Sequence, residues 1–171
     1  GRREIADAVS KQIMELSYAT SFTVINNREV ELATRIAAQT PGDLNRIYFT
    51  TGGSTAVDSA LRLCQLASNI KGHPQRKHII SREKAYHGST YLSASITGKE
   101  RDKTAMDIMR DGIHFLSAPC HFYHPEFPTE AEFCDFLVDE LEQKILEIGP
   151  ENVMCFIAEP ILASGGVIVP P

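Results

Sequence analysis

The sequence lacks both an excess of positive charge and a long apolar segment. Its 171 residues include 17 Lys and Arg against 22 Asp and Glu, which gives a formal net charge of -5. Proteins that bind nucleic acid need clustered Lys and Arg to neutralise phosphates, so we expect no nucleic-acid partner. The most apolar window, residues 153–169, is interrupted by Glu159 and Pro160. We therefore expect no membrane-spanning segment.

Cysteine pairs and several ligand-binding fingerprints are also absent. The four cysteines are scattered and form no C-x-x-C pair, at Cys64, Cys120, Cys134 and Cys155. This pattern predicts buried thiols in a reducing, cytoplasmic setting, and the first residues do not resemble a secretory signal. The nucleotide P-loop, the dinucleotide motif G-x-G-x-x-G and the nucleophile elbow G-x-S-x-G are missing.

Predicted strands and helices alternate along the chain. Helical spacing of apolar residues predicts helices over 3–16, from Asn26 or Asn27 to 37, from Ser54 to about 71, over 89–97 and over 129–148. The last of these begins with a capping box. Apolar or β-branched runs predict strands over 47–51, 78–81, 113–116 and 153–158. With no hairpin signal, this order predicts an α/β fold: a three-layer, mostly parallel sheet with helices on both faces.

The chain is organised around residues 47–62, which are expected to form a strand, a glycine turn and the start of a helix. Ser54 is expected to cap that helix, and Asp58 to lie in its first turns, where negative charge suits the dipole. Free backbone N–H groups beside Gly52 and Gly53, with no Cβ in the way, favour an anion, most often a phosphate. The alternative is a tight turn that uses Gly-Gly-Ser only for its geometry.

Two further polar features follow predicted strands. Parallel sheets bind ligands at the C-terminal ends of their strands, where Tyr86, His87 and Glu159 are expected. Tyr86 can stack on a planar ligand, with His87 adding a hydrogen bond, or it can pack locally in a surface loop. Glu159 is either exposed at the sheet rim or held by a cation in a site.

A metal site is the alternative considered for the loop that contains Cys120, His121 and His124. Their spacing matches no zinc pattern, and no fourth ligand is evident. We expect these residues to pack within a structured loop and to hold no metal.

Three motifs, in this order, resemble class III pyridoxal-phosphate-dependent aminotransferases: residues 49–58, 85–90 and 158–171. Residues 41–44 and 144–149 look similar too. The likeness is to the omega-amino acid or amine:pyruvate group, and it extends over essentially the whole chain. It implies part of the large domain of a fold-type I transferase, usually a homodimer with its sites at the subunit interface.

The resemblance also implies roles for individual residues. The phosphate of pyridoxal 5'-phosphate would be held by Gly52, Gly53 and Ser54. The ring would stack on Tyr86 beside His87, and Glu159 would lie near cofactor and substrate. Tyr18 and Phe22 match a segment that shapes the substrate pocket. Thr55 and Leu162 depart from the Glu and Gln of many members, which leaves substrate choice open.

The resemblance implies a reaction that moves an amino group from an amine or omega-amino acid to a keto acid such as pyruvate. The family's Schiff-base lysine and ring-nitrogen aspartate are expected beyond Pro171, because no lysine of the chain lies in a matching context. We therefore expect a fragment truncated at both ends. Residues 1–45 would be an N-terminal helical segment, and residues 46–171 the N-terminal and central part of the large domain. The alternative is a non-catalytic binding or assembly module of the same fold.

Overall fold

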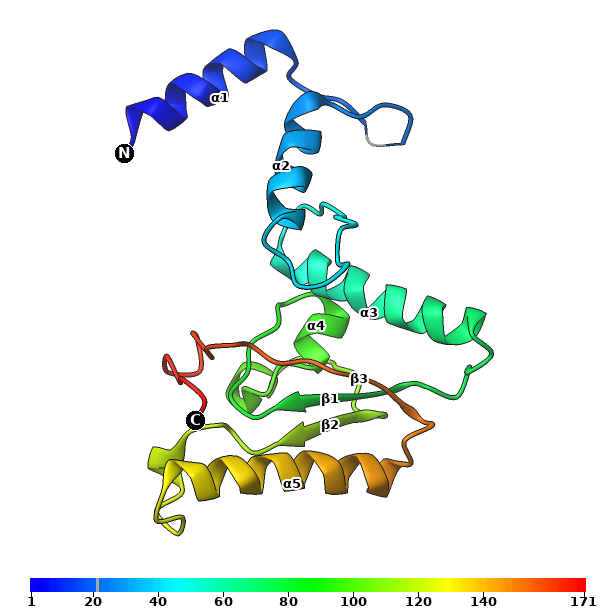
Figure 1. Cartoon of the computed structure of the whole chain (residues 1–171), viewed down its shortest axis with the longest axis vertical. Coiled ribbons are helices and arrows are strands. Elements are labelled where there is room, and N and C mark those ends of the chain that lie inside the picture. The colour runs from blue at the N-terminus through cyan, green and yellow to red at the C-terminus, as the bar shows by residue number, and fades with distance from the viewer. Residues whose placement is uncertain (21) are drawn as a thin grey trace. The chain divides into compact units, whose positions relative to one another are not determined.

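The computed structural model describes residues 1–20 and 22–171. They form two compact units, Gly1–Phe49 and Thr50–Pro171 (Figure 1). The predicted division after residue 45 stays a prediction. No helix among the described residues combines the length and apolar character needed to cross a membrane.

The first unit holds two amphipathic helices, α1 (Arg3–Glu15) and α2 (Asn27–Ala37). Asn26 is the N-cap of α2: its side chain accepts a hydrogen bond from the backbone N–H of Glu29 at 2.9 Å. This settles which asparagine caps the helix. Neither helix contains a fully buried residue, so their apolar stripes are at most partly covered.

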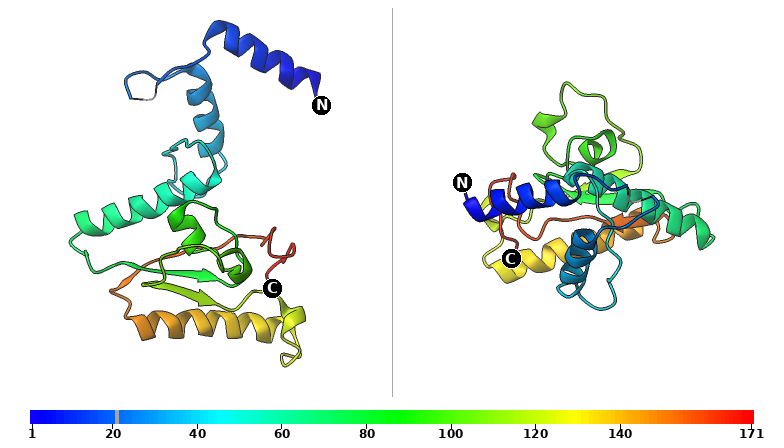
Figure 2. Two further views of the ribbon diagram at one scale, coloured as in Figure 1. Left: turned by 180° about the vertical axis from the view of Figure 1, so that it is seen from behind. Right: turned by 90° about the horizontal axis from the view of Figure 1, so that it is seen from above.

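The second unit is built on a three-stranded parallel sheet in the order β2-β1-β3. The strands are β1 (His78–Arg82), β2 (Ile113–Leu116) and β3 (Val153–Phe156). Figures 1 and 2 show α3 (Gly53–Ile70) and α4 (Tyr91–Ser95) on one side of this sheet and α5 (Glu130–Ile148) on the other. The predicted α/β class and layer order are confirmed.

Two buried clusters hold the second unit together. Leu61 of α3 packs with Ile79 of β1 and with Ile96, which follows α4. Ala85, after β1, packs with Leu162 and Ile168. An isolated antiparallel bridge joins these last two residues, so the turn between them folds back onto the loop after β1. This second cluster brings the chain after β3 against the chain after β1.

Helix α5 confirms the predicted capping box. The Thr129 hydroxyl accepts from the backbone N–H of Glu132 at 3.2 Å, and the Glu132 carboxylate accepts from the backbone N–H of Thr129 at 3.0 Å. In the preceding loop, which includes η2 (His121–Tyr123), the histidines pack within the protein. His121 Nε2 lies 2.8 Å from the Phe127 carbonyl oxygen. The His124 ring stacks on the Phe133 ring, with 4.8 Å between the ring centres.

One predicted strand is wrong. Residues 47–51 adopt no strand, and the described part of the chain offers them no backbone-to-backbone hydrogen bond. The side chain of Tyr48 is 72% exposed. Apolar and β-branched composition favours an extended backbone, but a strand forms only where a neighbouring strand supplies its hydrogen bonds.

Two other elements are shorter than predicted. Strand β3 ends at Phe156, and α4 covers only Tyr91–Ser95. Hydroxyl groups hold the end of α4: Ser95 Oγ donates to the Tyr91 carbonyl oxygen at 2.7 Å, and Thr97 Oγ1 donates to that of Ser93 at 3.0 Å. Serine and threonine compete in this way with regular helical hydrogen bonding.

Candidate functional site

The start of α3 is open. Gly52 is the N-cap, with φ 177° and ψ 171°, and a Cβ added at Gly52 or Gly53 would meet no atom within 4 Å. The first bond of the helix runs from the Ala56 N–H to the Gly52 carbonyl oxygen at 2.9 Å. The N–H groups before Ala56 therefore lack helical partners, and the space beside Gly52 and Gly53 is open. A helix start of this kind accommodates an anion.

Ser54 does not cap α3, which corrects the sequence prediction. It lies inside the helix, and its Oγ accepts a hydrogen bond from the backbone N–H of Ser89 at 3.0 Å. The turn is held instead by Thr50 and Thr55, whose hydroxyls donate to the Gly52 carbonyl oxygen at 3.0 and 2.7 Å. Ser54 thus links the start of α3 to the loop after β1.

Gly88 makes this link possible. Its φ is +135°, and a Cβ there would lie 2.5 Å from the hydroxyls of both Ser54 and Ser93. Only glycine fits such a close approach. Nearby, Asp58 Oδ1 accepts from the backbone N–H of Ser93 at 3.0 Å. Asp58 lies in the second turn of α3, and the first turn contains no acidic residue. Its carboxylate binds the start of α4, while its predicted effect on the helix dipole stays a prediction.

Glu159 meets the same loop. Its Oε1 accepts a hydrogen bond from the backbone N–H of Tyr86 at 2.8 Å. Glu159 is partly exposed and this partner is a backbone donor, so the choice between a carboxylate at the sheet rim and one held by a cation stays a prediction. Tyr86 as a residue is 43% exposed, so its ring is accessible to a planar ligand.

His87 is buried beneath the loop, with 7% of its surface exposed. Its backbone N–H donates to Thr97 Oγ1 at 3.0 Å, and its Nε2 lies 3.1 Å from Ser81 Oγ. That hydroxyl already donates to the Ile96 carbonyl oxygen at 2.8 Å, so His87 Nε2 carries the proton. Burial lowers the pKa of His87, and the negative charge of Glu159 partly offsets this effect.

Lys99 belongs to the site although no sequence pattern singled it out. Its Nζ lies 3.0 Å from Asp102 Oδ2, donates to Ser164 Oγ at 3.4 Å and lies 5.6 Å from the centre of the Tyr86 ring. The one local signal is the preceding glycine. A Cβ at Gly98 would lie 2.0 Å from the Arg82 carbonyl oxygen, which marks a close crossing of two segments.

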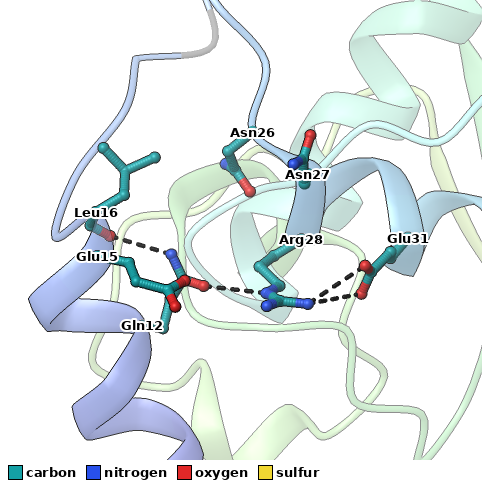
Figure 3. Close-up of a pocket in the computed structure, with 7 residues that line it drawn as sticks. All are labelled: Gln12, Glu15, Leu16, Asn26, Asn27, Arg28 and Glu31. Carbon is teal, nitrogen blue, oxygen red and sulfur yellow. Dashed lines mark hydrogen bonds and ion pairs between the residues drawn. The ribbon is translucent and has the colours of Figure 1, made fainter.

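Tyr18 and Phe22 belong to the first unit, where they are 79% and 94% exposed. A cavity of about 260 Å³ in that unit is lined by neither of them (Figure 3). Its Arg28 is already engaged, with Nε 3.0 Å from Gln12 Oε1 and a terminal nitrogen 3.1 Å from Glu31 Oε2. A substrate pocket formed by Tyr18 and Phe22 stays a prediction.

The chain matches the family model described as Aminotransferase class-III over residues 2–171. It is similar to putrescine–pyruvate aminotransferase of Pseudomonas aeruginosa, with 40% identity over 172 residues that cover 100% of this chain and 38% of that protein. Diaminobutyrate–2-oxoglutarate transaminase of Halomonas elongata is 34% identical, with 100% and 37% covered.

Solved structures agree. An (S)-enantioselective omega-transaminase from Thermomicrobium roseum gives a TM-score of 0.94 at 36% identity, and the match covers 100% of this chain and 38% of that one. The omega-transaminase of Pseudomonas jessenii in complex with PMP gives a TM-score of 0.93 at 34% identity, and this match also covers 100% of this chain and 38% of that one. The chain thus spans about two fifths of the length of these relatives.

Proposed function

The chain belongs to the class III aminotransferase family, as its motifs predicted, and from this membership we propose that it forms the cofactor-binding part of a pyridoxal 5'-phosphate-dependent transaminase. The observation that carries the proposal is the convergence of three separate motifs. Ser54 and Ser89 join the start of α3 to the loop after β1, and Tyr86 and Glu159 join that loop to the end of β3.

The residues of this site fit the cofactor. The open helix start at Gly52, Gly53 and Ser54 suits a phosphate dianion, because its free N–H groups and the helix dipole both favour negative charge. The exposed ring of Tyr86 suits a pyridine ring. When bound, the cofactor supplies the electron sink for the carbon that carries the amino group. Glu159 holds the backbone of Tyr86, and buried His87 supports the loop from beneath.

We propose that these residues act within a longer enzyme. The chain spans 38% of its putrescine–pyruvate relative. Lys99, whose Nζ lies 5.6 Å from the centre of the Tyr86 ring, is already paired with Asp102. The lysine that holds the cofactor and the aspartate at the ring nitrogen would lie outside residues 1–171. The names of the relatives support an amine or omega-amino acid as donor and a keto acid such as pyruvate as acceptor.

We also propose that the full-length enzyme is a homodimer in the cytoplasm. Helix α1 exposes Ile5, Val9 and Ile13 at 58%, 53% and 56%, which suits a face that a second subunit covers. All four cysteines are free thiols, and unpaired cysteines suit a reducing compartment.

Gly53→Val in the full-length enzyme tests the phosphate site. A side chain at Gly53 would occupy the open space before the helix start and keep the phosphate from the N–H groups. Loss of one hydrogen bond to a charged group costs about 1.5–3 kcal/mol, so the dissociation constant of pyridoxal phosphate should rise about 10- to 150-fold.

Ala60→Val is the matched control, because it places the same β-branched side chain at an exposed position of the same helix. Cofactor titration followed by absorbance measures both variants. Equal, unchanged affinity in the two would reject this phosphate site.

A further inference from the structure

Lys99 places a largely buried ammonium group beside the proposed ring wall. Its side chain is only 15% exposed. Lys99 directly follows Gly98, where the backbone passes close to the Arg82 carbonyl group. A buried charge is stable only when other groups compensate it. For Lys99 these groups are Asp102, Ser164 and the face of the Tyr86 ring, at 3.0, 3.4 and 5.6 Å.

These partners hold the ammonium in place. Asp102 lies in η1 (Glu100–Asp102), and its hydrogen bond from Lys99, with a further one from Arg101, lowers the pKa of the carboxyl group. The Asp102 carboxyl group therefore stays ionised at neutral pH. Ser164 lies in the turn that packs against the chain after β1, where a Cβ at Gly165 would lie 2.6 Å from the Lys84 carbonyl oxygen.

The ring of Tyr86 has little else to orient it. Glu159 binds the backbone N–H of this residue and leaves the side chain free. Within the described residues, no hydrogen bond to the Tyr86 hydroxyl is present, and 43% of the residue is exposed. Lys99 is the cation over its ring, and a cation near an aromatic face restrains the orientation of that ring.

We propose that Lys99 is a positioning residue for the cofactor. It holds the Tyr86 ring in the orientation that stacks on the pyridine, and through Ser164 it couples that ring to the turn after β3. This inference rests on the proposed function, since it requires a planar cofactor at Tyr86. It assigns to Lys99 no bond to the cofactor and no proton transfer.

The surroundings of Lys99 provide matched variants. Lys99 lines a cavity of about 360 Å³ with Lys84, Arg101 and the turn around Gly165, so Lys99→Met replaces the charge without overpacking. Lys84 lies in the same cavity wall, but its Nζ lies over Tyr123, 4.2 Å from the ring centre. Lys84→Met therefore removes an equivalent charge and an equivalent aromatic contact while it spares Tyr86.

The experiment measures the dissociation constant of pyridoxal phosphate and the visible circular dichroism of the bound cofactor in the full-length holoenzyme. Lys99→Met should raise the dissociation constant about two- to fivefold, the range expected for a cation–π contact whose ring is partly exposed to solvent, and should weaken the dichroic band. Lys99→Arg should restore both, since a guanidinium also binds aromatic faces. Lys84→Met should change neither.

A double-mutant cycle separates positioning from general stability. In a Tyr86→Leu background, Lys99→Met should cause no further loss of cofactor affinity, because its target ring is gone. An undiminished loss in that background would overturn the inference, as would parental affinity and dichroism in Lys99→Met. If Lys99→Met does not fold, Ser164→Ala takes its place in the cycle, with a smaller loss expected and the same result in the Tyr86→Leu background.

The two proposals fail differently. If Tyr86→Leu weakens cofactor binding and the Lys99 and Ser164 variants leave it unchanged, only the role of Lys99 is rejected. If Tyr86→Leu itself leaves cofactor affinity unchanged, the ring wall of the proposed function is rejected as well.

Discussion

At the residue scale, a partly buried carboxylate shortly after an apolar strand needs a partner, and Glu159 has one in the backbone N–H of Tyr86. This bond sets the position of the Tyr86 backbone, while Lys99 lies near its ring. The residue that we expect to touch the cofactor is thus held at two points by groups from two other segments.

The ring of Tyr86 provides a prediction at this scale. Tyr86→Ala should weaken pyridoxal phosphate binding more than Tyr86→Phe, because stacking contributes about 0.5–1.5 kcal/mol beyond burial and phenylalanine keeps the ring. Cofactor titration of the two full-length variants measures the difference. Equal losses would point to the hydroxyl group and away from stacking.

At the element scale, the site depends on contacts between helix starts and a loop. Helices α3 and α4 are joined by Asp58, which accepts from the N–H of Ser93, and Ser54 ties α3 to the loop before α4. Helix α4 covers only Tyr91–Ser95, too short to be stable by itself. Its place is set by the polar groups of α3.

Asp58 therefore has a measurable effect on stability. Asp58→Ala leaves the N–H of Ser93, a fully buried residue, without its acceptor. An unsatisfied buried donor costs about 1–3 kcal/mol, and the free energy of unfolding should fall by that amount. Asp58→Asn keeps an oxygen in the same place and should lose much less. Urea denaturation compares the two variants, and equal stability of Asp58→Ala and the parent would contradict this role.

At the scale of the whole molecule, buried His87 and partly buried His114 connect stability to pH. Burial lowers the pKa of His87 and of His114 below 6.5. The pKa of His114 is lowered further by the nearby charges of His78 and Lys144 and is raised by that of Glu147. The folded state therefore binds fewer protons than the unfolded state at pH values just below 6.5.

The contribution of these two histidines to the free energy of unfolding should therefore be greatest above pH 6.5 and should fall as the pH drops below that value. His114→Gln removes one of the two groups and should flatten this decline. Melting temperatures of parent and variant at pH 7.5 and 5.5 provide the test. A parent that is more stable at pH 5.5 than at pH 7.5, or a variant with an undiminished decline, would contradict the assignment.

Local sequence determined much of this protein. Periodicity and capping residues predicted β1, β2, α5 and its capping box, because they depend on residues only a few positions apart. The alternation of elements predicted the parallel sheet. The order of three motifs predicted the family, and the strand ends predicted where polar groups would gather.

Tertiary structure alone decided which groups meet. Ser54 and Ser89 are 35 residues apart, and Tyr86 and Glu159 are 73 apart; no local pattern encodes such pairs. For the same reason Ser54 was wrongly predicted as a cap and Lys99 was missed. Residues 47–51 have strand composition but no strand, because the sequence of a segment sets its backbone preference, whereas its hydrogen-bond partners depend on what packs beside it.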